Sequence, residues 1–127
     1  MDAKKLALEC RELADNRKAE DIAVLDVADV SSIADYFVIA SGTSEPHLRA
    51  ISDEITEKLR EDHGLKPRAV DGTLQAGWLV LDYFDVIVHV MRADVRQWMR
   101  LMFSPGRYSR TPKTSSSPRL AADDSPK

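Results

Sequence analysis

The sequence predicts a single α/β domain in which helices flank a five-stranded sheet. Five short runs rich in β-branched and aromatic residues have the length of strands, and three longer stretches carry an apolar repeat of 3.6 residues. With 127 residues, 43% of them hydrophobic, the chain is long enough to bury one core. We expect the domain to occupy residues 1–108, and residues 109–127 to form a disordered basic tail rich in serine and proline.

The centre of the predicted sheet is a hairpin. Its two apolar runs, 78–81 and 86–90, are separated by four residues, which suits a tight antiparallel connection. No polar residue interrupts the first run before Asp82, so we expect both faces of that strand to be covered. In the second run valines alternate with Ile87 and His89, which makes His89 the one polar group on its face.

Three further strands complete the sheet, at residues 22–27, 35–41 and 66–70. The connector 28–33 is too short for a parallel crossover, so the first two of these strands should pair antiparallel. Residues 71–73, Asp-Gly-Thr, are typical of a turn that leads towards the hairpin.

Helices are predicted at residues 2–17, 45–63 and 93–103. The first carries Cys10 on its apolar stripe, where a cysteine is most simply a small buried side chain and not a nucleophile. The apolar stripe of the second helix consists of Leu48, Ile51, Ile55 and Leu59. The stripe of the third helix, which we expect to pack on the sheet, consists of Val95, Trp98, Met99 and Met102.

The ends of the long helix are also marked in the sequence. Thr43 or Ser44 can accept a hydrogen bond from the first turn, and Pro46 fits there because its missing N–H is not needed. Gly64 should terminate the helix, because glycine adopts the left-handed conformation without strain.

Charge is unevenly distributed along the chain. Residues 104–127 hold five basic and two acidic side chains, although the whole chain has a net charge of −3. An acidic body is a poor platform for nucleic acid, since phosphate binding depends on lysine and arginine, and it suits a basic protein partner better. The apolar runs are too short to span a bilayer, no leader segment opens the chain, and the lone cysteine excludes an intramolecular disulfide, so we expect a cytoplasmic protein.

Three sets of residues could carry chemistry. Ser41-Gly42-Thr43-Ser44 stands before a helix and could hold an anion, but one glycine and no following lysine favour a simple turn and helix cap. A second set of carboxylates at strand ends could hold Mg²⁺, although aspartate next to a turn is more often structural. That set consists of Asp26, Asp35, Asp82 and Asp85.

The third set is the histidines His47, His63 and His89. No pair of them has the spacing of metal ligands on a helix or a strand. We therefore expect neither a metal nor another cofactor.

Several segments together resemble a known family. These are Asp35-Tyr-Phe-Val-Ile-Ala-Ser-Gly-Thr-Ser44, His47 with Ala50-Ile51, Asp71-Gly72, Trp78, and Leu81-Asp-Tyr-Phe-Asp-Val-Ile-Val-His-Val-Met91. In this order they look like the ribosomal silencing factor family (RsfS, also called Iojap), over about residues 4–103.

The resemblance implies a mixed α/β fold, similar to nucleotidyltransferases but without their catalytic residues. It also implies a protein that is not an enzyme. Members bind the large ribosomal subunit through ribosomal protein L-fourteen and sterically block the small subunit, which lowers translation when nutrients are short. The free protein would be a monomer or a homodimer.

The resemblance also suggests which residues face the partner. The hairpin residues carried over are Trp78, Asp82, Tyr83, Asp85 and His89, with Asp71 and His47 as weaker additions. For Trp78, filling the core is an equally good reading.

This chain departs from the family at two places. Phe84 stands where the family usually has glycine, so the turn differs or Phe84 projects as an extra apolar contact. Met99, Leu101-Met102 and Phe103 occupy a region where the family carries a glutamate, which puts that glutamate's contact in doubt.

Two further readings remain open. The alternative function is a nucleotidyltransferase-like, nucleotide-binding enzyme that uses Gly42-Thr43-Ser44 and the aspartates with Mg²⁺. The glycine-serine pair followed closely by paired aspartates, which marks that class, is absent from the sequence. The basic tail lies outside the family core, and we expect it to touch ribosomal RNA weakly.

Overall fold

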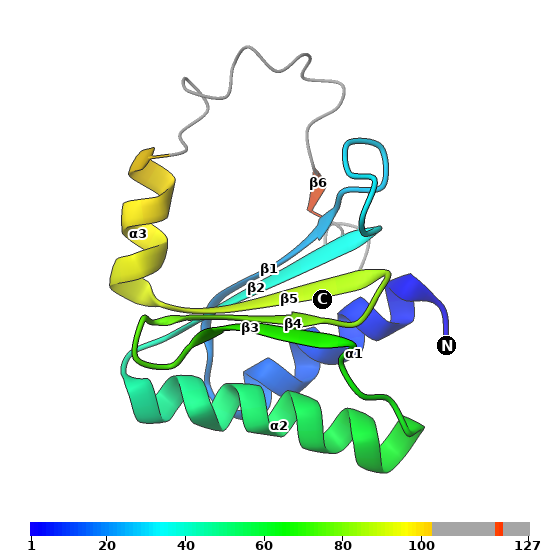
Figure 1. Ribbon diagram of the computed structural model, residues 1–127, viewed down its shortest axis with the longest axis horizontal. Helices are drawn as coiled ribbons and strands as arrows, with labels where there is room; N and C mark the ends of the chain where they lie inside the picture. The colour runs from blue at the N-terminus through cyan, green and yellow to red at the C-terminus, as the bar shows by residue number, and fades with distance from the viewer. Residues whose placement is uncertain (103–118, 121–127) are drawn as a thin grey trace.

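In the part of the chain that the structure describes, helices cover one face of a twisted sheet and leave most of the other face uncovered. The computed structural model describes residues 1–102 and 119–120. In Figure 1, α1 (Ala3–Asn16) and α2 (Glu45–His63) lie beneath the sheet, whereas α3 (Ala93–Met102) rises from one end of the opposite face. The strands are β1 (Glu20–Asp26), β2 (Tyr36–Gly42), β3 (Ala69–Thr73), β4 (Trp78–Asp82), β5 (Val86–Arg92) and the two-residue β6 (Arg119–Leu120).

The predicted single α/β domain with a mixed sheet is confirmed. The strand order is β3-β4-β5-β2-β1-β6, with β2 and β5 parallel and every other neighbouring pair antiparallel. The short connector between β1 and β2 joins an antiparallel pair, as expected. β6 pairs with the end of β1, so residues 119–120 form a strand inside the segment predicted to be disordered. The rest of that segment, like the predicted domain limit at residue 108, lies outside the described residues.

The parallel pairing of β2 and β5 joins the two halves of the chain. It runs in register over seven residue pairs, from Tyr36 opposite Val86 to Gly42 opposite Arg92. The crossover between the two strands contains α2, β3 and β4, so this pairing brings together segments that lie far apart in the sequence.

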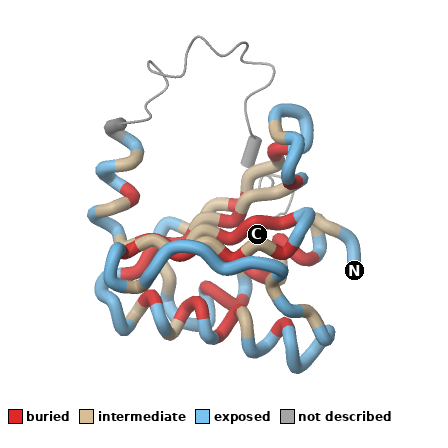
Figure 2. The backbone as a smooth tube through the Cα atoms, viewed as in Figure 1, coloured by how far each residue is buried: buried red, intermediate tan, exposed pale blue. Residues whose placement is uncertain are grey.

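The core lies between the sheet and the first two helices. Alternate residues of the central strands, among them Val38 and Val88, point into it and are fully buried. Figure 2 shows this buried layer between the sheet and the inner sides of the helices. The predicted stripe of α2 is confirmed, because all four of its members have no exposed surface, and each contributes about 1.5–3 kcal/mol by burial. Cys10 is also fully buried, and burial raises the pKa of its thiol to about 12.

The predicted ends of α2 are confirmed as well. The Ser44 side chain accepts a hydrogen bond from the His47 N–H, and Gly64 ends the helix in the left-handed conformation, with φ +66°. Among the described residues, no helix is long and apolar enough to cross a membrane.

The expectation that both faces of residues 78–81 are covered was wrong. Leu79 and Leu81 are buried against the helices, but Trp78 and Val80 alternate with them and are only half-buried. An uninterrupted apolar run is typical of a strand that is covered on both faces, yet none of the described helices lies over the second face of β4 (Figure 1).

The third strand lies further along the chain than predicted. It covers Ala69–Thr73, so the residues expected to form a turn pair with β4, and the turn falls at residues 74–77. Gly72 permits this because it adopts φ +83°, and a Cβ there would come within 2.0 Å of the Trp78 carbonyl oxygen. Glycine within a strand was therefore mistaken for a turn signal.

The stripe predicted for α3 was partly wrong. Trp98 is 56% exposed, whereas Arg96, which the apolar pattern did not include, is buried. Met102 lies where side chains are not described.

Phe84 occupies the turn between β4 and β5 in a conformation that favours glycine. Its φ is +81° and its side chain is 60% exposed. The guanidinium of Arg68 lies 4.0 Å from the centre of the ring, and the Phe84 N–H donates to the Asp82 carboxylate. Phe84 thus projects outward, as one of the two expected alternatives had it, at the cost of local backbone strain.

Replacing Phe84 should expose this strain. We expect the free energy of unfolding of Phe84→Gly to be about 1 kcal/mol higher than that of Phe84→Ala. Both variants lose the ring, but only glycine removes the penalty of positive φ, roughly 1–2 kcal/mol. Urea unfolding measures both. At Glu57, an exposed position inside α2, the order should be reversed, with alanine about 1 kcal/mol better than glycine. Equal stabilities of the two Phe84 variants would show that the turn carries no such strain.

Candidate docking site on the open sheet face

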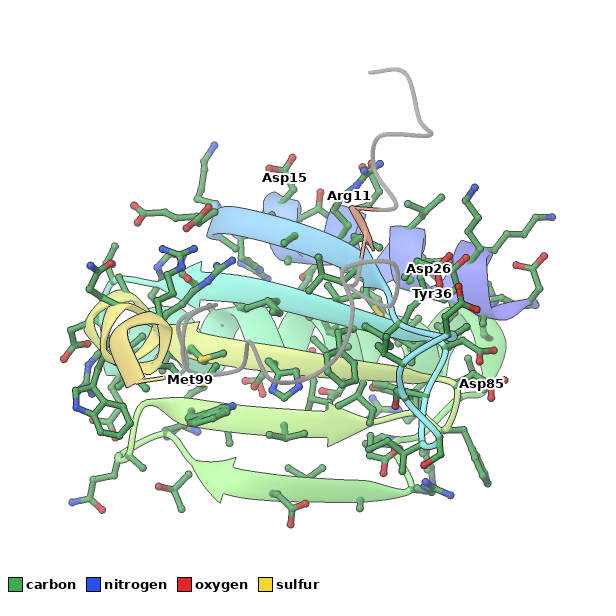
Figure 3. All side chains as sticks on the ribbon, turned by 90° about the horizontal axis from the view of Figure 1, so that it is seen from above. Arg11, Asp15, Asp26, Tyr36, Asp85 and Met99 are labelled. Atoms are coloured by element: carbon green, nitrogen blue, oxygen red, sulfur yellow. The ribbon has the colours of Figure 1, made fainter. Side chains whose placement is uncertain are left out.

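The uncovered face of the sheet carries an apolar groove at the foot of α3. It has a volume of about 550 Å³, and its surface is mostly apolar. Figure 3 looks onto this face, with Met99 at the α3 end and Asp85 at the opposite end of the sheet. The groove is lined by Ala23, Leu25, Ile39, Trp78, Met91, Arg96, Met99 and Arg100.

Three aromatic rings form a row across this face, which we call the aromatic row: Phe37 of β2, His89 of β5 and Trp78 of β4. The Phe37 and His89 rings meet edge to face, with centroids 5.3 Å apart. The Trp78 indole Nε1–H donates to His89 Nδ1 at 3.2 Å. Such contacts fix the rings in place, so the face is rigid as well as apolar.

His89 is the polar member of the row and is held uncharged. Burial lowers the pKa of His89 from its ordinary value of 6.5 to about 4, because the surrounding apolar side chains disfavour the imidazolium. The face therefore presents no positive charge at its centre near neutral pH.

An arginine fixes α3 beside the groove. Arg96 donates to the Asp21 backbone carbonyl and, over 2.8 Å, to Ser41 Oγ, while Arg100 forms an ion pair of 2.8 Å with the Asp21 carboxylate. Arg96 is 7% exposed, so these bonds lie largely out of water. They connect α3 to β1 and β2 and set the end wall of the groove.

The structure brings four of the predicted partner-facing residues onto this face. Trp78 and His89 belong to the aromatic row, and Asp82 follows on the same side of β4, two residues beyond Val80. Asp82 forms an ion pair of 3.2 Å with Arg68 and accepts from the Phe84 N–H. Asp71 lies opposite Val80 in the register of β3 and β4 and is exposed at that edge.

The other hairpin residues lie elsewhere. Asp85 is exposed at the end of the sheet, where its backbone carbonyl accepts from the N–H groups of Asp35 and Tyr36 (Figure 3). Tyr83 is 7% exposed within the core on the helix side. Burial raises the pKa of Tyr83, and its hydroxyl has no hydrogen-bond partner among the described residues. A ring in that position is not available on the open face.

His47 has a structural task near the start of α2. Its Nδ1 accepts from the Thr43 N–H at 2.9 Å, and its Nε2 lies 2.7 Å from the Arg17 carbonyl oxygen. The histidine thereby connects the start of α2 to the end of α1, on the opposite side of the sheet from the groove.

The remaining candidates are engaged in the fold. Ser44 caps α2, and a Cβ on Gly42 would come within 2.8 Å of the Leu48 side chain, so this glycine serves close packing. His63 pairs with Glu9 at 3.0 Å. Among residues 1–102 and 119–120, no group of three or more His, Cys, Asp or Glu residues is placed to hold a metal ion.

Sequence reasoning missed several residues of this site. Phe37 and Ile39 alternate with the buried Val38 and Ala40 along β2, so a period of two could have assigned them to the second face. Arg96 gave no such signal, because a charged residue on a helix is normally solvated.

Comparisons with known proteins agree on one family. Residues 1–102 match the model of the family described as "Ribosomal silencing factor during starvation". A ribosomal silencing factor RsfS of Bacillus subtilis is 37% identical over 87 residues, which cover 68% of this chain and 73% of that protein. A crystal structure from Chromobacterium violaceum has a TM-score of 0.74 at 27% identity and covers 80% of this chain and 83% of its own. One from Bacillus halodurans has a TM-score of 0.68 at 31% identity, covering 78% and 91%.

The half-buried, neutral His89 should make stability depend on pH. Unfolded His89 gains a proton near pH 6.5 and the folded residue only near pH 4, so the unfolded state binds more protons between these values. The stabilisation is fully present above about pH 6.5 and falls as the pH is lowered towards 4, by on the order of 2–3 kcal/mol. Urea unfolding at pH 7 and 4.5 measures the loss.

His89→Gln is the control for this effect, because glutamine does not titrate. Other acidic-range effects, such as the lowered pKa of Asp21 beside Arg100, remain in both proteins and cancel in the comparison. A loss of stability in His89→Gln as large as that of the parent would assign the pH dependence to other groups.

Proposed function

Because this chain belongs to the ribosomal silencing factor family, we propose that it binds the large ribosomal subunit and keeps the small subunit from joining. The contact that we propose is ribosomal protein L-fourteen, and the blockade is steric. A bound domain of this size at the subunit joint leaves no room for the other subunit. Translation then falls when nutrients are limited.

The observation that carries the proposal is the open sheet face with its groove and aromatic row. Monomeric proteins rarely leave a contiguous apolar surface uncovered unless it binds something. Rings already locked in place lose little conformational entropy on binding, and tryptophan is among the residues that most often dominate binding energy.

Charge supports a basic protein as the partner. The end of the open face away from α3 carries Asp35, Asp82 and Asp85, of which Asp82 is paired with Arg68, and Asp26 lies there opposite Arg119 in the register of β1 and β6. Ribosomal proteins are rich in lysine and arginine, and opposite fields speed encounter and orient docking. The apolar groove would then meet the partner's apolar surface, with the acidic end fixing the direction of approach.

Cosedimentation with separated ribosomal subunits tests the proposal directly. The purified chain should pellet with large subunits, and small subunits added afterwards should fail to form complete ribosomes. Complete ribosomes forming at the normal level while the chain stays bound would refute the steric mechanism. Absence of binding to large subunits would refute the proposal as a whole.

Trp78 should be an anchor of this contact. We expect Trp78→Ala to weaken binding to large subunits by roughly 1–3 kcal/mol, about 5- to 150-fold, because the ring lines the groove and belongs to the aromatic row. Trp98→Ala is the matched control, since Trp98 is exposed but does not line the groove and should leave binding unchanged. Circular dichroism must show that both variants are folded. Equal binding by both would remove Trp78 from the site.

Asp85 should act through charge. Asp85→Lys is expected to weaken binding about 5- to 20-fold at low salt, with a smaller effect at high salt, because screening shortens the reach of the field. Asp53→Lys makes the same charge change on an exposed position of α2, away from the open face, and is expected to change binding less than twofold. Similar losses in the two variants would indicate that only the net charge matters.

The basic tail supplies a second proposed contact, with ribosomal RNA. Deleting residues 109–127 should flatten the salt dependence of binding to large subunits, because fewer counterions are then released from phosphate. The measurement is the slope of log affinity against log salt concentration. An unchanged slope would count against any phosphate contact by the tail.

A further inference from the structure

His89 has a hydrogen-bonding pattern that is fixed by its neighbour. It lies on the open face between Phe37 and Trp78, and Trp78 Nε1 lies 3.2 Å from His89 Nδ1. An indole nitrogen can only donate, so Nδ1 must carry a lone pair. The single proton of the neutral ring therefore resides on Nε2.

The Nε2–H at the opposite edge of the ring has no acceptor within the described part of the fold. Among the described residues, the only hydrogen bond of the His89 side chain is the one to Trp78. Its strand neighbours on this face, Ile39 and Val80, are apolar and offer no side-chain acceptor. His89 is half-buried, and water can still reach the face in the free protein.

A partner that covers this face would take the water away from Nε2–H. A donor left unpaired in an apolar interface lowers affinity, so a well-matched partner must provide an acceptor at this point. That acceptor should be neutral. The imidazole is uncharged, its strand neighbours are apolar, and the two arginines of the groove already bond to Asp21 and Ser41. An anion such as a carboxylate or phosphate would therefore lose its hydration without compensation.

We propose that His89 is a specificity-determining residue of the open face, which donates its Nε2–H to a neutral oxygen acceptor, such as a backbone carbonyl, of the protein that docks there. The inference rests on the proposed function for the existence of that partner. It adds a hydrogen-bonding requirement: among apolar partner surfaces, the face prefers one that places an acceptor at His89 Nε2. Trp78 then acts twice, as an apolar anchor and as the group that holds the histidine in the donating tautomer.

The tautomer is tested in the free protein, independently of any ribosome. Nitrogen-15 NMR at pH 7 should show His89 protonated at Nε2 and unprotonated at Nδ1. In Trp78→Phe, where the ring remains but the indole donor is gone, the Nδ1–H form should become populated. A parent protein with its proton on Nδ1 would overturn the inference.

Binding to large ribosomal subunits tests the donor itself. His89→Phe keeps a ring of similar shape without a donor, and we expect its affinity to drop about 10- to 100-fold. His89→Gln can accept from Trp78 through Oε1 and donate through Nε2, so its affinity should stay within about threefold of the parent. Unchanged binding by His89→Phe, or equal losses in both variants, would overturn the inference.

A third variant and the parent keep the result interpretable. The shorter His89→Asn places its amide only at the level of Nδ1, so it should bind as weakly as His89→Phe. This variant replaces His89→Phe in the test if the phenylalanine variant does not fold. Strong binding by His89→Asn would contradict the assignment of the donor to Nε2. If the parent protein itself ignores large subunits, the proposed function fails, while the tautomer measurement still decides the state of His89.

Discussion

The arrangement of residues 1–102 depends on their helices α1 and α2 covering the sheet from one side only. Both long helices, α1 and α2, pack beneath it, and their apolar stripes meet Val38, Val88 and their neighbours in a single core. The parallel pairing of β2 and β5 at the centre holds the two halves of the chain to this common layer. Stability is thus concentrated below the sheet, and the upper face is free to be shaped by binding.

The upper face is built from the residues that the core does not use. Because side chains alternate along a strand, every Val or Leu directed to the helices leaves a neighbour directed upward, and in the central strands these neighbours include Phe37, Trp78 and His89. The short α3 does not cover them. It is fixed at one end by the buried Arg96, which makes it a wall of the groove and not a lid.

Much of this fold could be predicted from the sequence, because the strongest signals are local. Short stretches of sequence predict the apolar stripe of α2, its cap at Ser44 and its end at Gly64, and the structure confirms all three. The strand pairs joined by short connectors were equally accessible. The matches to the family model and to solved structures confirm the family inferred from the motifs.

The errors came from properties that depend on distant residues. Whether β4 is covered on both faces is decided by where α3 goes, which no pattern within residues 78–81 contains. Gly72 reads as a turn but serves a close approach to the Trp78 backbone. Arg96 reads as a solvated charge but meets Asp21 and Ser41, some 75 and 55 positions away. Tyr83, chosen by resemblance, was placed in the core by the pleat of the hairpin.

The burial of Cys10 has a consequence for anyone who handles this molecule. The lone thiol has no exposed surface and remains protonated at neutral pH, so in the native state it cannot react readily with alkylating reagents or oxidants. Modification then has to wait for α1 to leave the sheet. The rate at which Cys10 is modified therefore reports how often the domain opens, without any engineered label.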